Sequence, residues 1–273
     1  MRLVATDLDR TLLNDEGRLS DKNLRALERL KQHDFTTIIA TGRNIYSARK
    51  ILDSNLNFDH LIFSSGSGVL DWRKDELIFN VSLTMSDSAR AVDILLKHKA
   101  DFMIHDEVPD NHHFLYYDHG YNNVDFRNRI SLYEEFANEW DKSEIKFPVS
   151  QILAVIPQDE MQKFDLIREE LSFVKVIRTT SPLDHSTIWL EIFPSHVSKG
   201  HTLSWLCNRL GIDQKNTFSL GNDYNDIDML EWTNQGYLVA NAPDDMKSNY
   251  PHTLSNEDDG FSVWVEQILK KEN

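Results

Sequence analysis

The sequence contains a single cysteine, Cys207, among 273 residues. One cysteine excludes an intrachain disulfide framework and a zinc cage built from cysteines, and it is compatible with a reducing cytoplasm. No apolar run reaches the roughly 18 residues that a membrane-spanning helix needs. At the N-terminus, Asp7 and Asp9 interrupt the apolar residues too early for a signal peptide. We therefore expect a cytoplasmic protein without a membrane partner.

Positive charge is also scarce, because 29 Lys and Arg face 44 Asp and Glu, for a formal net charge of −15. Nucleic acids and anionic membranes attract clustered Lys and Arg, so this balance argues against both as main partners. An anionic substrate would require local compensation by a divalent cation or a few basic side chains. The length and the 40% hydrophobic content suit a globular protein of one large domain or two smaller ones.

The strongest local signal lies near the start, where an apolar run from Leu3 ends in Asp7 and Asp9, followed by Thr11. A buried strand of an α/β sheet presents functional residues where it ends. Two carboxylates this close repel, so at least one should be protonated or held on a cation. Mg²⁺ accepts carboxylate and carbonyl oxygens. The strand end is a candidate nucleophile and metal site, and a solvated acidic turn is the alternative.

Strands and helices alternate in the first third of the chain. A helix over about 20–30 leads to a strand that ends at Thr41, and a helix over 45–52 leads to a strand that ends at Ser65. This order predicts a parallel sheet with right-handed crossovers. The polar side chains that follow these strands should therefore gather at one edge of the sheet.

The alternation stops near residue 82 and returns towards the C-terminal end of the chain. Between these points, adjacent strands without an intervening helix indicate an α+β unit with antiparallel pairing. We interpret residues 1–81 and 188–273 as an α/β core and residues 82–187 as an inserted α+β domain.

Four polar clusters recur in the core at strand or helix ends, and each could be a turn, a solvated charge or a helix cap on its own. Together they suit phosphoryl transfer. Asp7 would attack phosphorus and form an acyl-phosphate, while Asp9 would protonate the leaving oxygen and then activate water. Thr41 and Gly42 would hold phosphoryl oxygens, and Lys199 would offset negative charge. The cluster at 222–226 would complete an Mg²⁺ shell.

These clusters match four motifs of a known superfamily. They are D-x-D-x-T at Asp7-Leu8-Asp9-Arg10-Thr11, a strand-ending Thr at Thr41, V-S-K-G at Val197-Ser198-Lys199-Gly200, and G-D-x-x-N-D-x-x-M-L at Gly221-Asn222-Asp223-Tyr224-Asn225-Asp226-Ile227-Asp228-Met229-Leu230. Asn241-Ala242 and residues 256–260 are similar as well. The chain resembles a haloacid dehalogenase superfamily phosphatase of the Cof type, the branch with a large inserted cap of class IIB.

The resemblance implies a Rossmann-like core, a cap that selects the substrate, and Mg²⁺ as cofactor. It implies catalytic roles for Asp7, Asp9 and Lys199, phosphate binding by Thr41, Gly42, Lys199 and Asn225, and metal binding by Asp7, Asp9 and the acidic or amide residues Asn222, Asp223 and Asp226.

The sequence departs from the family pattern at three positions. Arg10 stands where glycine is usual, and Ser65 stands where asparagine is common after the third strand. Asn222 replaces the metal-binding aspartate, and an amide oxygen can bind Mg²⁺ but brings no charge. Asp223 or Asp226 are alternatives as the missing ligand. The third metal ligand and activity itself therefore depend on this site.

The inserted domain contains a stretch, residues 105–129, that is dense in histidine, tyrosine, asparagine and aspartate. Such side chains can hydrogen-bond a hydroxyl-rich ligand, and they are equally compatible with an ordinary aromatic-rich surface. Their spacing fits no zinc signature. Nothing in the domain identifies a particular substrate.

The leading hypothesis is an Mg²⁺-dependent monomeric phosphatase that hydrolyses a small phosphorylated metabolite, such as a sugar phosphate, through an aspartyl-phosphate on Asp7. A phosphomutase would return the phosphoryl group to the substrate instead. A non-catalytic ligand-binding protein on the same fold is a third possibility, because fold alone does not determine function. Asn222 is the feature that favours the third, and the intact Asp7, Asp9, Thr41 and Lys199 argue against it.

Overall fold

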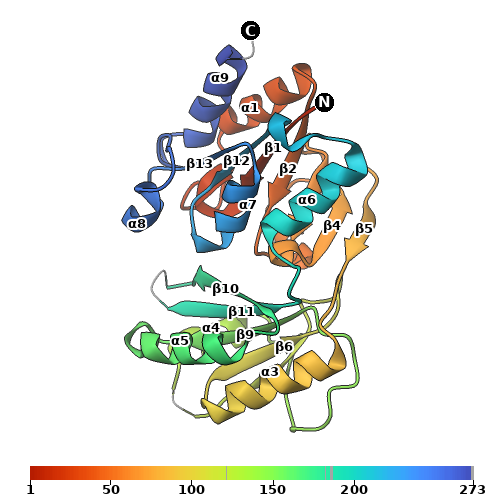
Figure 1. Ribbon diagram of the computed structural model, residues 1–273, viewed down its shortest axis with the longest axis vertical. Coiled ribbons are helices and arrows are strands. Elements are labelled where there is room, and N and C mark those ends of the chain that lie inside the picture. Colours follow the sequence, from red (N-terminus) through yellow and green to blue (C-terminus); the bar gives the residue numbers. More distant parts are fainter. Residues whose placement is uncertain (121, 182, 185–186, 272–273) are drawn as a thin grey trace. The chain divides into compact units, whose positions relative to one another are not determined.

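The computed structural model describes residues 1–120, 122–181, 183–184 and 187–271. The chain forms two compact units, one made of residues 1–79 and 198–273 and the other of residues 80–197 (Figure 1). The return to the core therefore falls after Val197, later than the expected change at residue 188. The reason is that the strand β11 (Ile188–Phe193) hydrogen-bonds within the sheet of the second unit.

The core sheet has the strand order β13-β12-β1-β2-β3-β4-β5. Its strands are β1 (Arg2–Asp7), β2 (Phe35–Ala40), β3 (His60–Phe63), β4 (Gly68–Asp71), β5 (Glu76–Asn80), β12 (Thr217–Gly221) and β13 (Gln235–Leu238). Strands β13 to β3 pair in parallel, which confirms the predicted α/β core. The extension by β4, which is antiparallel to β3, and by β5 was not predicted.

The helices of the core follow the predicted alternation. They are α1 (Asp21–Gln32), α2 (Ile45–Arg49), α6 (Lys199–Leu210), α7 (Ile227–Trp232), α8 (Asp244–Lys247) and α9 (Gly260–Lys271). The inward face of α6 buries Leu203 and Leu206 against Leu3 and Ala5 of β1, residues that alternate along the strand and so share one face of the sheet. Helices α1 and α9 pack side by side (Figure 1).

The register of the core sheet explains why polar side chains from distant parts of the chain meet. Asp7, the last residue of β1, pairs with Ala40 of β2, and Thr6 pairs with Leu220 of β12. Because parallel strands end at the same edge of a sheet, the residues that follow these three strands are neighbours. This confirms the expectation that Asp7 and Thr41 share one edge.

The second unit is an α+β sandwich around the strand order β10-β11-β9-β6-β7-β8. Its other bounds are β6 (Asp101–His105), β7 (Phe114–Tyr117), β8 (Ala137–Glu139), β9 (Gln151–Ile156), β10 (Lys175–Thr180), α3 (Met85–Lys97), α4 (Val124–Leu132) and α5 (Met161–Glu170). Pairing is antiparallel except between β7 and β8. Phe102 and Ile104 pack in the hydrophobic core that includes residues of α3 and α5, whereas Met103 packs with Phe126 of α4. In the part of the chain that is described, no helix has the length and apolar character to cross a membrane.

Candidate active site

The segment after β1 is an irregular helical turn, residues Leu8–Leu12, in which Asp9 and Arg10 leave the helical conformation. Arg10 has a φ of 55°, in the left-handed region that glycine adopts without strain. This backbone conformation accounts for the glycine that the family resemblance leads one to expect at this position. Arg10 directs its guanidinium to Asp15, with 3.2 Å between Nε and Oδ1.

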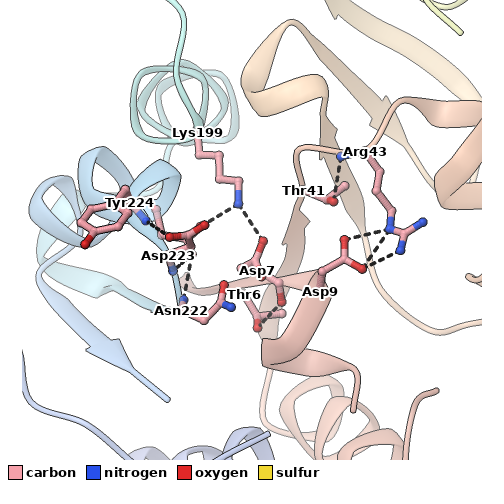
Figure 2. Close-up of polar contacts among 10 residues, drawn as sticks. Thr6, Asp7, Asp9, Thr41, Arg43, Lys199, Asn222, Asp223 and Tyr224 are labelled. Carbon is pink, nitrogen blue, oxygen red and sulfur yellow. Dashed lines mark hydrogen bonds and ion pairs between the residues drawn. The ribbon is translucent and has the colours of Figure 1, made fainter. Parts of the chain in front are cut away.

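A buried cation lies between two carboxylates at the end of β1. The Lys199 Nζ atom is 2.7 Å from Asp7 Oδ1 and 2.6 Å from Asp226 Oδ1 (Figure 2). Lys199 and Asp226 are completely buried, and Asp7 is 4% exposed. Lys199 is the first residue of α6, whose N-cap Ser198 accepts a hydrogen bond from the backbone of His201. The helix start thus fixes where the lysine enters the site.

Burial changes the protonation of this group. It raises the pKa of Asp7 to about 7; the negative charges of Asp226 and Asp9 add to the rise, and Lys199 opposes it. Burial alone would lower the pKa of Lys199, but Asp226 and Asp7 reverse the effect and hold that pKa above its ordinary value. Lys199 is therefore a permanent positive charge.

The carboxylate of Asp226 is fully engaged by the protein. One oxygen contacts Lys199, and the other accepts the backbone N–H groups of Asn222 at 2.8 Å and Asp223 at 3.1 Å. Asp223 Oδ1 accepts the N–H of Tyr224 at 2.8 Å, and Asp223 and Asp226 form a reciprocal capping box, in which the side chain of each accepts the backbone N–H of the other. Asp226 therefore anchors the lysine and shapes the loop, with both of its oxygens engaged by the protein.

The side chains that fit a cation are those outside this network. Asp7 Oδ2 is buried and has no hydrogen-bond partner among the described residues. The amide group of Asn222 is not used in the loop contacts (Figure 2). Within the described ranges, no group of three His, Cys, Asp or Glu side chains could hold a metal ion. A cation here would rely on one orphaned carboxylate oxygen, amide or carbonyl oxygens, and water, a set that suits Mg²⁺.

A second cluster surrounds Gly42, immediately after β2. A Cβ atom on Gly42 would lie 3.5 Å from Ser65 Oγ and 3.6 Å from Asn225 Nδ2. Thr41 is buried, and its Oγ1 accepts the backbone N–H of Arg43 at 3.1 Å. The predicted Thr41, Gly42 and Asn225 are thus brought together, with Ser65 as a neighbour that the motif comparison noted without assigning it a role.

Arg43 is a site residue that sequence reasoning missed. Its Nε lies 3.0 and 2.8 Å from the two carboxylate oxygens of Asp9, and its Nη2 lies 2.7 Å from Oδ1 (Figure 2). Its Nη1 donates to Ser47 Oγ at 2.9 Å. Such a planar, two-pronged ion pair fixes the orientation of a carboxylate. The available signal was the position of Arg43 in the Thr41-Gly42-Arg43 strand end.

The histidine-rich stretch of the second unit does not form a metal centre among its described residues. His105 is buried in β6, and its Nδ1 lies 2.9 Å from the carbonyl oxygen of Asn111. Burial, reinforced by the charge of Arg129, lowers the pKa of His105 to about 3. His112 and His113 pack their rings against Phe136. Tyr121 of this stretch lies outside the described residues.

Comparison with known proteins places the chain in a family. Residues 4–265 match the model of the haloacid dehalogenase-like hydrolases, and the chain belongs to that family. It is 25% identical to the putative phosphatase YxeH of Bacillus subtilis, with 98% of each chain covered. It is also 25% identical to the 5-amino-6-(5-phospho-D-ribitylamino)uracil phosphatase YwtE of the same organism, again with 98% of each covered.

A solved structure supports the same assignment of the fold. The subclass IIB sugar phosphatase BT4131 superposes with a TM-score of 0.78 at 18% identity, covering 98% of this chain and 99% of that one. The fold is therefore that of the haloacid dehalogenase-like hydrolases. With this family and these relatives, the protein is a phosphatase.

Proposed function

We propose that the protein is an Mg²⁺-dependent phosphatase for a small phosphorylated metabolite, of the sugar phosphate class, and that it works through an aspartyl-phosphate on Asp7. The observation that carries the proposal is the buried Asp7–Lys199–Asp226 arrangement at the ends of β1 and β12. The names of YwtE and BT4131, which refer to a phosphorylated ribityl compound and to sugar phosphates, support the substrate class.

Asp7 is the nucleophile in this proposal. Lys199 holds one of its oxygens, and the other has no partner within the described chain, so one carboxylate remains able to engage phosphorus or a cation. Attack forms a bond from a carboxylate oxygen to phosphorus and breaks the bond to the leaving oxygen. The fixed charge of Lys199 favours the ionised carboxylate and offsets charge on the phosphoryl group.

Asp9 is the general acid and base. It donates a proton to the leaving oxygen, and in the second half-reaction it removes a proton from the water that attacks the acyl-phosphate. Arg43 orients the Asp9 carboxylate in the conformation seen here. Thr41, Gly42 and Asn225 bind phosphoryl oxygens with hydroxyl, backbone and amide donors, and Lys199 contributes its charge.

Mg²⁺ would be held by Asp7 and Asn222, with Asp9 contributing to the site and water or substrate oxygens filling the remaining positions. When bound, the ion neutralises charge that develops on the transferring phosphoryl group. The engaged oxygens of Asp226 argue against that residue as a ligand. Asp223 remains the alternative to Asn222.

The metal proposal is tested by Asn222→Asp. A second carboxylate should tighten Mg²⁺ binding by about tenfold or more, measured by calorimetry on the free protein as well as by the Mg²⁺ dependence of turnover. Asp223→Asn serves as the matched control and should leave the affinity nearly unchanged. Weaker binding in the control, with no gain in Asn222→Asp, would move the ligand role to Asp223.

We also propose that the second unit selects the substrate, in a monomeric cytoplasmic enzyme. The side chains assigned above engage only the phosphoryl group and its leaving oxygen, which all phosphate monoesters share. Selection among esters therefore requires groups elsewhere in the chain. Variants in the second unit should change the ranking of substrates while they leave the hydrolysis of p-nitrophenyl phosphate intact.

The function is tested by phosphate release from a panel of phosphorylated metabolites, with Mg²⁺ and with EDTA. We expect Mg²⁺-dependent release that is highest for sugar phosphates and is abolished in Asp7→Asn, whose amide cannot form the acyl-phosphate. Isomerised sugar phosphate without free phosphate would instead support a phosphomutase. Binding without turnover across the panel, from folded protein, would support a ligand-binding protein, the alternative that Asn222 favours.

A further inference from the structure

The turn that carries Asp9 is held in a strained conformation by contacts from the end of the chain. Arg10, the residue after Asp9, has a φ of 55° although it is not glycine. Its carbonyl oxygen accepts a hydrogen bond from Asn241 Nδ2 at 2.9 Å. Asn241 Oδ1 accepts the backbone N–H of Asn256 at 3.0 Å, so both ends of the amide are used and its orientation is fixed.

Asn256 extends this clamp along the same turn. Its Nδ2, on a residue that is 3% exposed, donates to the carbonyl of Leu13 at 3.3 Å and to Asp15 Oδ1 at 3.0 Å. Asp15 in turn accepts the Nε–H of Arg10. The backbone and the side chain of Arg10 are thus both tied to the segment that contains Asn241 and Asn256.

We propose that Asn241 is a positioning residue for the Asp9 acid–base, acting through the Arg10 carbonyl. Without this hydrogen bond, Arg10 would relax from its left-handed conformation and the peptide next to Asp9 would turn. Arg43 fixes the Asp9 side chain, and Asn241 fixes the backbone beside it. The inference rests on the proposed role of Asp9 and adds to it a residue distant in the sequence.

Asn23, in α1, provides a matched control because it contacts the same turn. Its Nδ2 donates to the carbonyl of Leu12 at 2.9 Å, and its Oδ1 accepts the backbone N–H of Ser262 at 3.1 Å. Asn23 is buried and makes the same two kinds of contact as Asn241. The carbonyl that it contacts, however, lies further from Asp9 and belongs to a residue with helical backbone angles. Loss of either asparagine amide removes one hydrogen bond to the turn, but only Asn241 contacts the residue next to Asp9.

The test compares Asn241→Ala with Asn23→Ala in kcat and KM for p-nitrophenyl phosphate with Mg²⁺, and in thermal unfolding. We expect Asn241→Ala to lower kcat by about 10- to 100-fold with KM nearly unchanged, because small displacements of a catalytic group are costly. Asn23→Ala should show a comparable loss of thermal stability with kcat within about twofold of the wild type. Equal effects on kcat, or none from Asn241→Ala, would overturn the proposal.

A second variant separates positioning from general weakening. Glycine adopts a φ near 55° without strain, so Arg10→Gly should reduce the dependence on the clamp. The effect of Asn241→Ala on kcat should then be several-fold smaller in the Arg10→Gly background than in the wild type. An undiminished effect would contradict the mechanism. A wild-type protein without phosphatase activity would refute the proposed function itself, whereas an active wild type with equal Asn241 and Asn23 effects would refute only this inference.

Discussion

The two units of the molecule bury ionisable groups among different partners. In the core, Asp7, Lys199 and Asp226 meet as charges of opposite sign at the ends of strands, and one oxygen of Asp7 has no partner among the described residues. Burial favours neutral forms in both units, but in the core Lys199 opposes it at Asp7, whereas in the second unit burial lowers the pKa of His105 and raises the pKa of Asp125. We assign the first group to the proposed chemistry and the second to packing.

Asp125 illustrates the packing role. Its two oxygens accept hydrogen bonds from Ser181 Oγ at 2.8 Å and from Trp189 Nε1 at 2.7 Å. These contacts join α4 to the segment after β10 and to β11, so the carboxyl group ties a helix to its sheet. A satisfied polar group of this kind specifies one arrangement of the core and leaves no atom to react.

The largest expected effect comes from removing the buried cation of the core. Lys199→Met leaves Asp7 and Asp226 buried without their common partner, which should destabilise the protein by about 3–5 kcal/mol. It should also lower kcat by on the order of 10²- to 10³-fold. Urea denaturation and phosphate release measure the two effects.

A double variant sharpens this result. Adding Asp226→Asn to Lys199→Met removes one of the two uncompensated charges and should restore part of the stability without restoring turnover. Recovery of activity in the double variant would show that Lys199 acts only through folding. The buried charges of the core would then serve packing, as Asp125 does in the second unit.

A smaller effect is expected at Arg43. Arg43→Gln releases the Asp9 carboxylate and should lower kcat by about tenfold or more. The unfolding free energy should change by less than about 1 kcal/mol, because the ion pair is partly exposed. Arg49→Gln is the matched control, since Arg49 forms an exposed ion pair with Asp75 in the same unit. Similar kcat values for both variants would exclude a role for Arg43 at the site.

In the second unit, His105 should make stability depend on pH. Its pKa is about 3 in the folded protein against an ordinary value of 6.5, so between these values the unfolded chain binds the proton and the folded chain does not. The unfolding free energy of the second unit should therefore be highest above pH 6.5 and about 2 kcal/mol lower at pH 5. Hydrogen exchange of the β6 amides measures this local stability.

The control for His105 keeps its hydrogen bond and removes its titration. His105→Asn retains a side-chain N–H donor for the Asn111 carbonyl, and its stability should depend less on pH between 7 and 5. Parallel pH profiles for the variant and the wild type would assign the acid sensitivity to other groups.

The smallest effect is expected at Asp125. Asp125→Asn replaces one of two accepting oxygens by a donor and should destabilise the second unit by about 1–2 kcal/mol. Hydrolysis of p-nitrophenyl phosphate by the core should stay unchanged. Asp165→Asn, at an exposed position of α5, provides the neutral comparison. A large loss of turnover in Asp125→Asn would contradict the assignment of this group to packing.

The sequence predicted the elements of the site that depend on local order. Strand patterns followed by Asp7 and Thr41 located the reactive edge, because parallel strands with helical crossovers end together. The boundary of the second unit was misplaced, since a strand pattern does not reveal which sheet the strand joins. Strand β11 lies just after the expected boundary, yet it pairs with β9 and β10 of the second unit.

The partners of the site residues could not be predicted in the same way. Asp226 was a candidate metal ligand, but tertiary packing directs it to Lys199 and to two backbone N–H groups. The contacts of Arg43 with Asp9 and of Asn241 with Arg10 join residues far apart in the chain. Such pairs follow from the register and the loop geometry, which single-residue patterns do not contain.

The most direct test of the central claim is the identification of the phosphorylated residue. The enzyme is mixed with substrate and Mg²⁺, quenched with acid within one turnover, and digested for mass analysis, in the wild type and in Asp9→Asn. We predict a phosphoryl group on Asp7, with more of it in Asp9→Asn, because hydrolysis of the intermediate is slowed. Turnover with the phosphoryl group on another residue, or with none on the protein, would contradict the account.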